Sequence, residues 1–375
     1  MKIGIVTWFR HQNYGTILQA LALQKYLRSN VNDVQLLNFQ LLDGVRIKNT
    51  DGMRLFEKFY YYFGRVIYHI IKKTNYNFFE KKSLKLKKVI DDNCVLTEHI
   101  VDNDNYVSIC NSFDCLFFGS DQIWNPNWYH PFYFGNVTGI KTKLVAYAPS
   151  FGVENIPKDL ENTYKCALEK FSYISSREES GKKIVEKYTD LTSEVVVDPT
   201  MLLSKREWEY FEETINIKPK KYILCYLLSD NYNHWKAIKK YAKKNMLDIV
   251  IIPQGGYSFI KSKNVIKDCS VGNFLHLIRN AEIVITDSFH ACIFSIIYNK
   301  QFLVFERKNP NDKRSQNSRI YNLLDTYELN DCLIKYNSKV IINKADINYT
   351  IINNKLCKKI QESKDFIKKI IVSLK

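Results

Sequence analysis

Short runs of apolar residues, rich in β-branched side chains, alternate along the chain with longer stretches whose apolar residues recur at helical spacing. Lys2 to Thr7 (KIGIVT) is the first short run; the polar loop WFRHQNYG follows it and leads into the periodic stretch TILQALALQKYL. The next short run is VQLLNF, at residues 34–39. This order predicts strand, helix and strand, a βαβ unit with a right-handed crossover. We therefore expect the chain to begin as a parallel α/β sheet.

The same alternation continues in two blocks. In the first block, apolar runs end in polar turns at FDCLFFGSDQ (113–122), KLVAYAPSFG (143–152), FSYISSREESG (171–181) and EVVVDP (194–199). In the second block, helical stretches separate the runs YILCYLL (222–228), DIVIIP (248–253), EIVIT (282–286) and FLVF (302–305). We predict an α/β fold of two Rossmann-like, doubly wound domains that face each other across a cleft. The predicted boundaries are 1–210 and 211–345, followed by a C-terminal amphipathic helix over 346–375.

A segment of different composition, residues 53–95, interrupts the first domain. Its part from 53 to 90 carries ten Lys or Arg against two Glu, interleaved with Tyr, Phe and Ile. We predict a helical insertion. A basic aromatic helix of this kind can lie on an anionic membrane surface, or it can form a solvated hairpin that caps the domain, and the sequence leaves both open.

The composition is that of a globular protein, with 46% hydrophobic and 25% charged residues in 375. No window approaches about 18 uncharged apolar residues, and the N-terminus is too quickly polar for a secretory signal. The nine cysteines contain no C-x-x-C pair. We expect a cytoplasmic protein, which the basic insertion could hold at the inner face of the membrane.

The formal net charge of +16 attracts anions in general, which include nucleic acid, anionic lipid and phosphorylated substrates. The excess is concentrated in residues 53–90 and in the C-terminal tail, not along a recognisable nucleic-acid reader. We therefore predict no nucleic-acid partner.

Four polar segments follow predicted strands, where parallel sheets bind ligands beside helix N-termini. They are Asn13-Tyr14-Gly15, Gly119-Ser120-Asp121-Gln122, Ser176-Arg177-Glu178-Glu179 and Asp287-Ser288-Phe289-His290. None of them matches a standard phosphate or metal signature, so we predict neither a bound metal nor a cofactor.

Each segment also has a structural interpretation. Asp287 or Ser288 could simply cap a buried helix, with His290 in its first turn as a structural histidine, and Arg177 could form a surface ion pair. In the functional interpretation, His290 does chemistry at an anion site and Arg177 clamps a carboxylate or phosphate.

In this order, the segments resemble the polysaccharide pyruvyl transferase family. The resemblance rests on Asn13 to Gly15, G-S-D-Q-x-W-N-P at 119–126, S-x-R-E-E-S-G at 175–181, V-x-D-P-T at 196–200 and S-F-H at 288–290. It implies a fold like that of GT-B glycosyltransferases and transfer of pyruvyl from phosphoenolpyruvate, as co-substrate, to two hydroxyls of one sugar. A cyclic ketal forms and phosphate is released. It implies no metal or nucleotide cofactor, and an acceptor that is commonly linked to a lipid diphosphate.

Carried over to this chain, the resemblance makes His290 the essential histidine and Arg177 a ligand of the donor. Better-characterised members read R-L-H where this chain has Ser288-Phe289-His290, so an arginine at the donor is replaced by serine. We predict that Arg319 replaces it, with Lys308 and Arg314 as weaker candidates, and we place Asp287 and Ser288 beside the donor.

We predict that His290 delivers the proton and that Asp121 is the base toward the acceptor. The predicted acceptor-binding residues are Asn13, Tyr14, Gly15, Ser120, Gln122 and Trp124. A glycosyltransferase with a nucleotide-sugar donor is the alternative function, since the same two-domain fold serves both.

Overall fold

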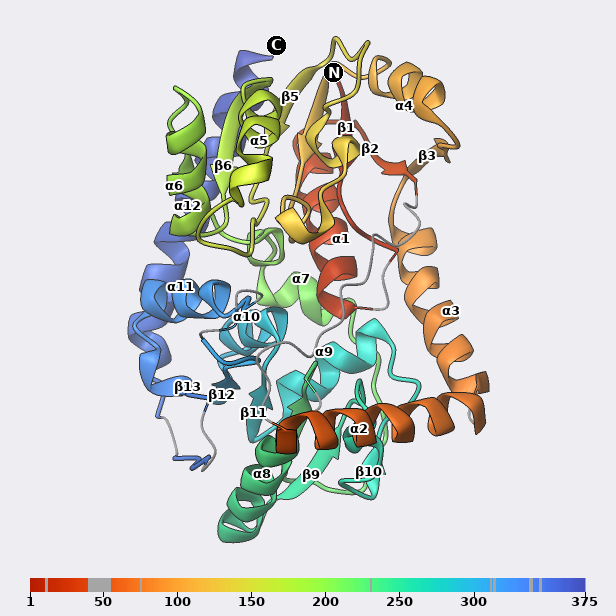
Figure 1. Ribbon diagram of the computed structural model, residues 1–375, viewed down its shortest axis with the longest axis vertical. Coiled ribbons are helices and arrows are strands. Elements are labelled where there is room, and N and C mark those ends of the chain that lie inside the picture. The colour runs from red at the N-terminus through yellow and green to blue at the C-terminus, as the bar shows by residue number, and fades with distance from the viewer. Residues whose placement is uncertain are drawn as a thin grey trace. The chain divides into compact units, whose positions relative to one another are not determined.

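Figure 1 shows the computed structural model. It describes residues 1–10, 13–39, 55–74, 76–229, 231–310, 312, 315–336, 340–343 and 346–374, and for 55–61 and 76 the backbone alone. The chain divides into two compact units. The first contains the described residues of Met1–Arg46, Val89–Leu203 and Ile351–Lys375, and the second those of Ile47–Lys88 and Ser204–Thr350.

The first unit is built on a parallel sheet with strand order β3-β2-β1-β4-β5-β6-β7. The strands are β1 Lys2–Val6, β2 Asp33–Asn38, β3 Leu96–His99, β4 Cys115–Phe118, β5 Lys143–Ala146, β6 Phe171–Ser176 and β7 Glu194–Val195. The helices are α1 Tyr14–Arg28, α4 Asn103–Cys110, α5 Glu161–Leu168, α6 Glu179–Tyr188 and α12 Tyr349–Ser373, with the 3₁₀ turns η1 Pro126–Trp128, η2 Pro131–Phe134, η3 Lys158–Leu160 and η4 Pro199–Leu202.

The second unit repeats this plan with a parallel sheet of order β10-β9-β8-β11-β12-β13. The strands are β8 Tyr222–Tyr226, β9 Asp248–Ile251, β10 Asn264–Val265, β11 Ile283–Thr286, β12 Phe302–Phe305 and β13 Leu333–Ile334. The helices are α2 Leu55–Thr74, α7 Lys205–Glu209, α8 Tyr232–Asn245, α9 Val271–Asn280, α10 Phe289–Ile297 and α11 Ser318–Tyr327, with η5 Tyr257–Phe259 and η6 Asn330–Cys332. Helix α3 Tyr76–Asn93 is divided, and Tyr76–Lys88 belongs to the second unit.

Both sheets have the arrangement that buried parallel strands require. The central strands β4, β8, β11 and β12 are buried along their whole length, because helices cover both faces of each sheet. In both units the strand order reverses direction beside the first strand, between β1 and β4 and between β8 and β11. The prediction of an α/β fold with two doubly wound sheets and a C-terminal helix is confirmed.

The insertion and the C-terminal helix differ from their predicted places. In the insertion, Phe63 packs on Tyr257 with ring centroids 6.3 Å apart, and Lys85 Nζ lies 3.0 Å from Asp268 Oδ2, so α2 and most of α3 are part of the second unit. From Ile351 onward, helix α12 is part of the first unit, where the hydroxyl of Ser363 accepts a hydrogen bond from the Val197 amide. Tertiary contacts, not order along the chain, decide both memberships.

Candidate functional site

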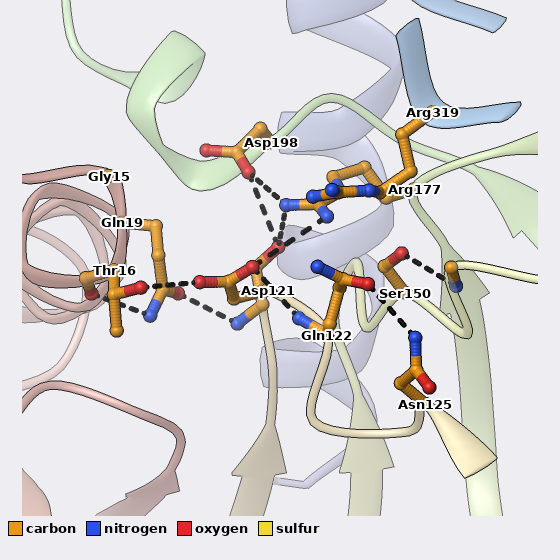
Figure 2. A network of polar contacts seen from close by, with 12 residues as sticks. Gly15, Thr16, Gln19, Asp121, Gln122, Asn125, Ser150, Arg177, Asp198 and Arg319 are labelled. Atoms are coloured by element: carbon orange, nitrogen blue, oxygen red, sulfur yellow. Dashed lines mark hydrogen bonds and ion pairs between the residues drawn. The ribbon is translucent and has the colours of Figure 1, made fainter. Parts of the chain in front are cut away.

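In the first unit, the point where the strand order reverses lies between β1 and β4, and residues Gly119–Gln122 follow β4 at that point. The Thr16 hydroxyl, on α1, donates to Asp121 Oδ2 at 2.7 Å, and the Ser120 amide donates to the side-chain carbonyl of Gln19 at 2.9 Å (Figure 2). Open α/β sheets bind their ligands at such reversal points. The polar segment after β4 is therefore held against α1 at the position expected for a site.

Gly119 explains how the chain turns so sharply after β4. Its φ is +125°, and a Cβ at this position would lie 2.1 Å from the carbonyl oxygen of Tyr147. Only glycine has both the conformational freedom and the space for this close approach. Asp121 follows with a φ of +61°, in the left-handed region that Asp tolerates better than most residues.

Arg177 lies at the end of β6 among three carboxylates. Its Nη1 donates to Asp198 Oδ2 at 2.8 Å and its Nη2 lies 3.9 Å from Asp121 Oδ1 (Figure 2). Its Nε lies 3.6 Å from Glu178 Oε2. The side chains of all four residues are nearly inaccessible to solvent. The interpretation of Arg177 as a surface ion pair is thus wrong, because the residue is the centre of a buried network.

The charges in this network favour a guanidinium that stays ionised. Burial lowers the pKa of Arg177, but Asp198, Glu178 and Asp121 together outweigh burial, and the pKa is raised above its ordinary value. One cation faces three carboxylates here, so the negative charges outnumber the positive one. The prediction that Arg177 holds the donor's anionic groups stays a prediction, and its surroundings favour a role in positioning Asp121 and Asp198.

The other residues predicted to bind the acceptor lie nearby in the same unit but differ in exposure. Asn13 caps α1, and its side chain accepts a hydrogen bond from the Gly15 amide at 3.0 Å. Tyr14 and Gly15 are buried. The Gln122 side-chain carbonyl accepts from the Asn125 amide group at 3.0 Å.

Trp124 packs in the interior of the first unit. Its ring is fully buried and stacks on Phe134 with centroids 5.2 Å apart, and its indole N–H donates to the Tyr133 carbonyl at 2.9 Å. A buried indole that has found its hydrogen-bond partner is part of the core. The prediction that Trp124 contacts the acceptor stays a prediction, and its packing favours a structural role.

In the second unit, the reversal point lies between β8 and β11, and Asp287–His290 follow β11 there. The carboxylate of Asp287 accepts hydrogen bonds from the amides of Leu228 and Ser229, at 2.6 and 2.8 Å. These amides belong to the loop after β8, so Asp287 joins the ends of the two strands. Asp287 is fully buried, and its place beside the donor stays a prediction.

Ser288 is the N-cap of α10, and its hydroxyl accepts a hydrogen bond from the Ala291 amide. His290 follows in the first turn of α10 and is 5% exposed, and its ring packs edge-on against Phe289 with centroids 5.3 Å apart. The first turn of a helix carries the positive end of the helix dipole. The capping interpretation of Ser288 is confirmed, and this cap leaves the imidazole of His290 in a positive field.

Two arginines lie around this helix start. The guanidinium of Arg319 lies 5.8 Å from the centre of the Phe289 ring, and its Nη2 donates to Gln316 Oε1 at 3.1 Å. Arg307 Nη2 donates to the Asp287 carbonyl at 3.1 Å, and its Nη1 lies 3.4 Å from the same Gln316 Oε1. Gln316 therefore brings the two cations together beside the residues that precede His290.

The sequence interpretation did not single out Arg307. This arginine stands two positions after β12, at the carboxyl end of a strand next to β11, and that position was the signal that could have identified it. Within the described part of the chain it forms no salt bridge with a carboxylate. Of the two weaker candidates, Lys308 offers its main-chain carbonyl to the Asn317 side chain, and Arg314 lies outside the described residues.

Two further properties concern metals and membranes. Among the residues that the structure describes, no three His, Cys, Asp or Glu side chains are grouped so that they could hold a metal ion. Within the same described ranges, every helix is too short or too polar to span a bilayer.

The comparison with protein families gives a direct result. The model of the family described as polysaccharide pyruvyl transferase matches residues 13–309. The chain belongs to the polysaccharide pyruvyl transferase family. It is therefore a transferase of the kind that moves pyruvyl groups in polysaccharide biosynthesis, and the matched range includes Asp121, Arg177 and His290 but ends before Arg319.

Solved structures show which fold this pyruvyl transferase shares with other proteins. UDP-GlcNAc 2-epimerase from Methanocaldococcus jannaschii is 13% identical, with a TM-score of 0.55 and 100% of both chains covered. UDP-GlcNAc 2-epimerase from Neisseria meningitidis, bound to UDP-GlcNAc, is 11% identical, with a TM-score of 0.52 and the same coverage. At such identities the likeness establishes the fold alone, which is GT-B-like. No curated protein matches the chain.

Proposed function

We propose that this pyruvyl transferase takes its pyruvyl group from phosphoenolpyruvate, which it binds on the second unit at the start of α10. One observation carries the proposal: Arg307 and Arg319 share the carbonyl oxygen of Gln316 beside the helix turn that contains His290. Phosphoenolpyruvate carries a carboxylate and a phosphate on neighbouring positions. Two guanidinium groups held together match two such anions, since each can form paired hydrogen bonds with one of them.

The replacement of the family arginine by Ser288 fits this arrangement. Ser288 caps α10, and a larger side chain at this nearly inaccessible position would displace the cap. The positive charge lost there is supplied by Arg319 and Arg307, from α11 and from the loop after β12. In this proposal Ser288 and Asp287 shape the donor site through the helix start and the β8 loop, and the arginines bind the anions.

The proposed reaction needs an acid at the methylene carbon of the donor. His290 protonates that carbon, which becomes a methyl group, and a sugar hydroxyl oxygen forms a bond to the adjacent carbon. The second hydroxyl then attacks the same carbon as the bond to the phosphate oxygen breaks. Phosphate leaves, a cyclic ketal remains, and of the two hydroxyl protons one replaces the proton that His290 gave and the other leaves with phosphate or solvent.

The positive end of the α10 dipole, with the two arginines, stabilises the negative charge that collects on the departing phosphate. Phosphoenolpyruvate is a co-substrate here, and the proposal requires no metal or other cofactor. The acceptor is a sugar of a polysaccharide precursor, and we place it on a lipid diphosphate carrier. The base toward its hydroxyl stays the predicted Asp121, whose carboxylate accepts from Thr16.

The experiment offers the protein a panel of glycan precursors, each with phosphoenolpyruvate or with a nucleotide-sugar. We expect a pyruvyl mass gain on one acceptor and equimolar release of phosphate, only with phosphoenolpyruvate. His290→Ala should reduce turnover by about 10² to 10⁴, the usual contribution of a positioned acid, and leave the fold intact. A hexose mass gain from a nucleotide-sugar would instead establish the glycosyltransferase function and overturn the proposal.

A further inference from the structure

The outward face of α2 is apolar and basic, and nothing in the catalytic proposal uses it. Between Tyr62 and Thr74 the inward residues are Gly64, Ile67, Tyr68 and Ile71, which recur at helical spacing and are buried or half-buried. On the opposite side, Tyr62, Val66 and Ile70 follow one another at intervals of four and are 52%, 54% and 58% exposed. Residues at this spacing form a single stripe along a helix.

A second stripe runs beside the first. Arg65, His69, Lys72 and Lys73 are all exposed, and the sequence from Tyr62 to Thr74 contains no Asp or Glu. At about 100° per residue, this basic stripe adjoins the apolar one on the same outward half of the helix. We name the two together the α2 face. Its charge is of one sign, so its complement is an anionic surface that also accepts apolar side chains.

The α2 face is held outward by packing on the other side of the helix. A Cβ on Gly256, at the start of η5, would lie 2.0 Å from the Gly64 carbonyl, so the backbone of α2 touches that loop directly. Tyr68 packs on Phe79 of α3, with ring centroids 5.6 Å apart. These contacts fix the rotation of α2 within the second unit. The apolar stripe is therefore exposed because of how α2 packs within the second unit.

We propose that the α2 face docks this protein on the surface of a membrane that contains anionic lipid. A helix in the plane of a bilayer places Tyr and aliphatic side chains at the acyl boundary and basic side chains among the headgroups, and the two stripes provide both. Among the described helices, α2 included, none is suited to span a bilayer, which agrees with a helix that lies on the surface. Nucleic acid would match the charge but would leave the apolar stripe without a partner.

The test is co-sedimentation of the full-length protein with vesicles of phosphatidylcholine, with or without phosphatidylglycerol. We expect binding only to the anionic vesicles. The triple variant Tyr62→Ser, Val66→Ser, Ile70→Ser should bind at least about tenfold more weakly. The variant Arg65→Gln, Lys72→Gln, Lys73→Gln should lose roughly fivefold for each charge removed. High salt should weaken the binding, because it screens the contribution of the basic residues. It should leave the contribution of the apolar stripe unchanged.

A matched control removes the same three residue types from exposed sites elsewhere. Tyr210, Val372 and Ile351 are 84%, 64% and 53% exposed. Their triple substitution by serine should leave vesicle binding unchanged. Wild-type protein that ignores anionic vesicles, or an α2 stripe variant that binds like wild type, would overturn the proposal.

One further outcome concerns a second copy of this chain as the occupant of the α2 face. Sedimentation velocity of wild type and stripe variant tests it. Dimers that dissociate only in the stripe variant, without vesicle binding, would assign the face to self-association and overturn the membrane proposal. Because vesicle binding requires no turnover, failure here and failure of the proposed reaction are separate results.

Discussion

Replacing Arg177 by methionine removes the cation from the buried network of the first unit and keeps most of the volume of its side chain. The guanidinium lies within 4 Å of Asp121, Glu178 and Asp198, at the distances of 3.9, 3.6 and 2.8 Å given above. All three carboxylates are nearly inaccessible to solvent. The variant therefore leaves three negative groups buried without their common partner.

The magnitude follows from the cost of breaking a buried ion pair. Loss of one partner typically costs 3–5 kcal/mol, because the remaining charge stays desolvated, so we expect a loss of about 3–5 kcal/mol in the stability of the first unit. For a unit of this size that is a decrease in Tm of roughly 6–20 °C. Adding Asp198→Asn should recover part of the loss, since the two residues form a 2.8 Å hydrogen bond.

The assay is chemical denaturation followed by circular dichroism, at two pH values. Without the guanidinium, the three neighbouring carboxylates repel one another while they are ionised. The loss of stability should therefore be larger at neutral pH than in mild acid. Arg307→Met is the matched control, because within the described residues Arg307 has no carboxylate partner. We expect this variant to lose only about 1–2 kcal/mol of stability.

An Arg177→Met variant with wild-type stability and a raised KM for the donor would refute this reasoning. It would show that the network does not depend on the guanidinium and that Arg177 binds the donor, as the family resemblance implies. A variant that is destabilised but keeps the donor KM would support the positioning role.

Three further predictions concern the second unit. Burial lowers the pKa of His234 to about 3. At a pH below about 6.5, the ordinary pKa of histidine, the unfolded chain binds a proton that the folded protein does not. The free energy of unfolding should therefore fall by about 2 kcal/mol from neutral pH to about pH 5. His234→Phe should abolish that decrease and keep the stacking on Phe305. Gly256→Ala should lower the free energy of unfolding by about 1–3 kcal/mol, because the added Cβ pushes η5 away from α2. Chemical denaturation measures this loss. Asp287→Asn should cost about 1–3 kcal/mol, because an amide N–H₂ would face a buried amide N–H.

Each of these has its own contrary result. A wild-type pH profile in the His234→Phe variant would assign the acid sensitivity to other groups. Wild-type stability of Gly256→Ala would mean that η5 is not held against α2. An Asp287→Asn variant as stable as wild type would show that the β8 loop does not depend on the carboxylate.

Much of the fold could be predicted because buried parallel strands are nearly continuous apolar runs. KIGIVT and DIVIIP each locate a strand within two residues of β1 Lys2–Val6 and β9 Asp248–Ile251. The strands β3 (LTEH), β10 (NV) and β13 (LI) lie toward the sheet edges and are too short or too polar to stand out. The place of the insertion depends on contacts such as Lys85 with Asp268, which join residues far apart in the sequence.

The candidate site was predictable in part for a related reason. Strand ends identified Asp121, Arg177 and His290, because polar residues after apolar runs are visible in the sequence. The sequence does not show which strand ends meet, so the carboxylate of Asp198 beside Arg177 was not expected. Trp124 lies close to Asp121 along the chain, yet packing directs its ring into the core.

The central claim is that the second unit binds phosphoenolpyruvate through Arg307 and Arg319 at the start of α10. Calorimetric titration of phosphoenolpyruvate into wild type, Arg307→Gln, Arg319→Gln and the exposed-site control Arg28→Gln tests it without knowledge of the acceptor. We predict that each of the first two variants raises Kd at least about tenfold, the effect of losing a charged hydrogen bond, and that the control binds like wild type. Equal affinity in all four proteins, or no binding by wild type, would contradict the claim.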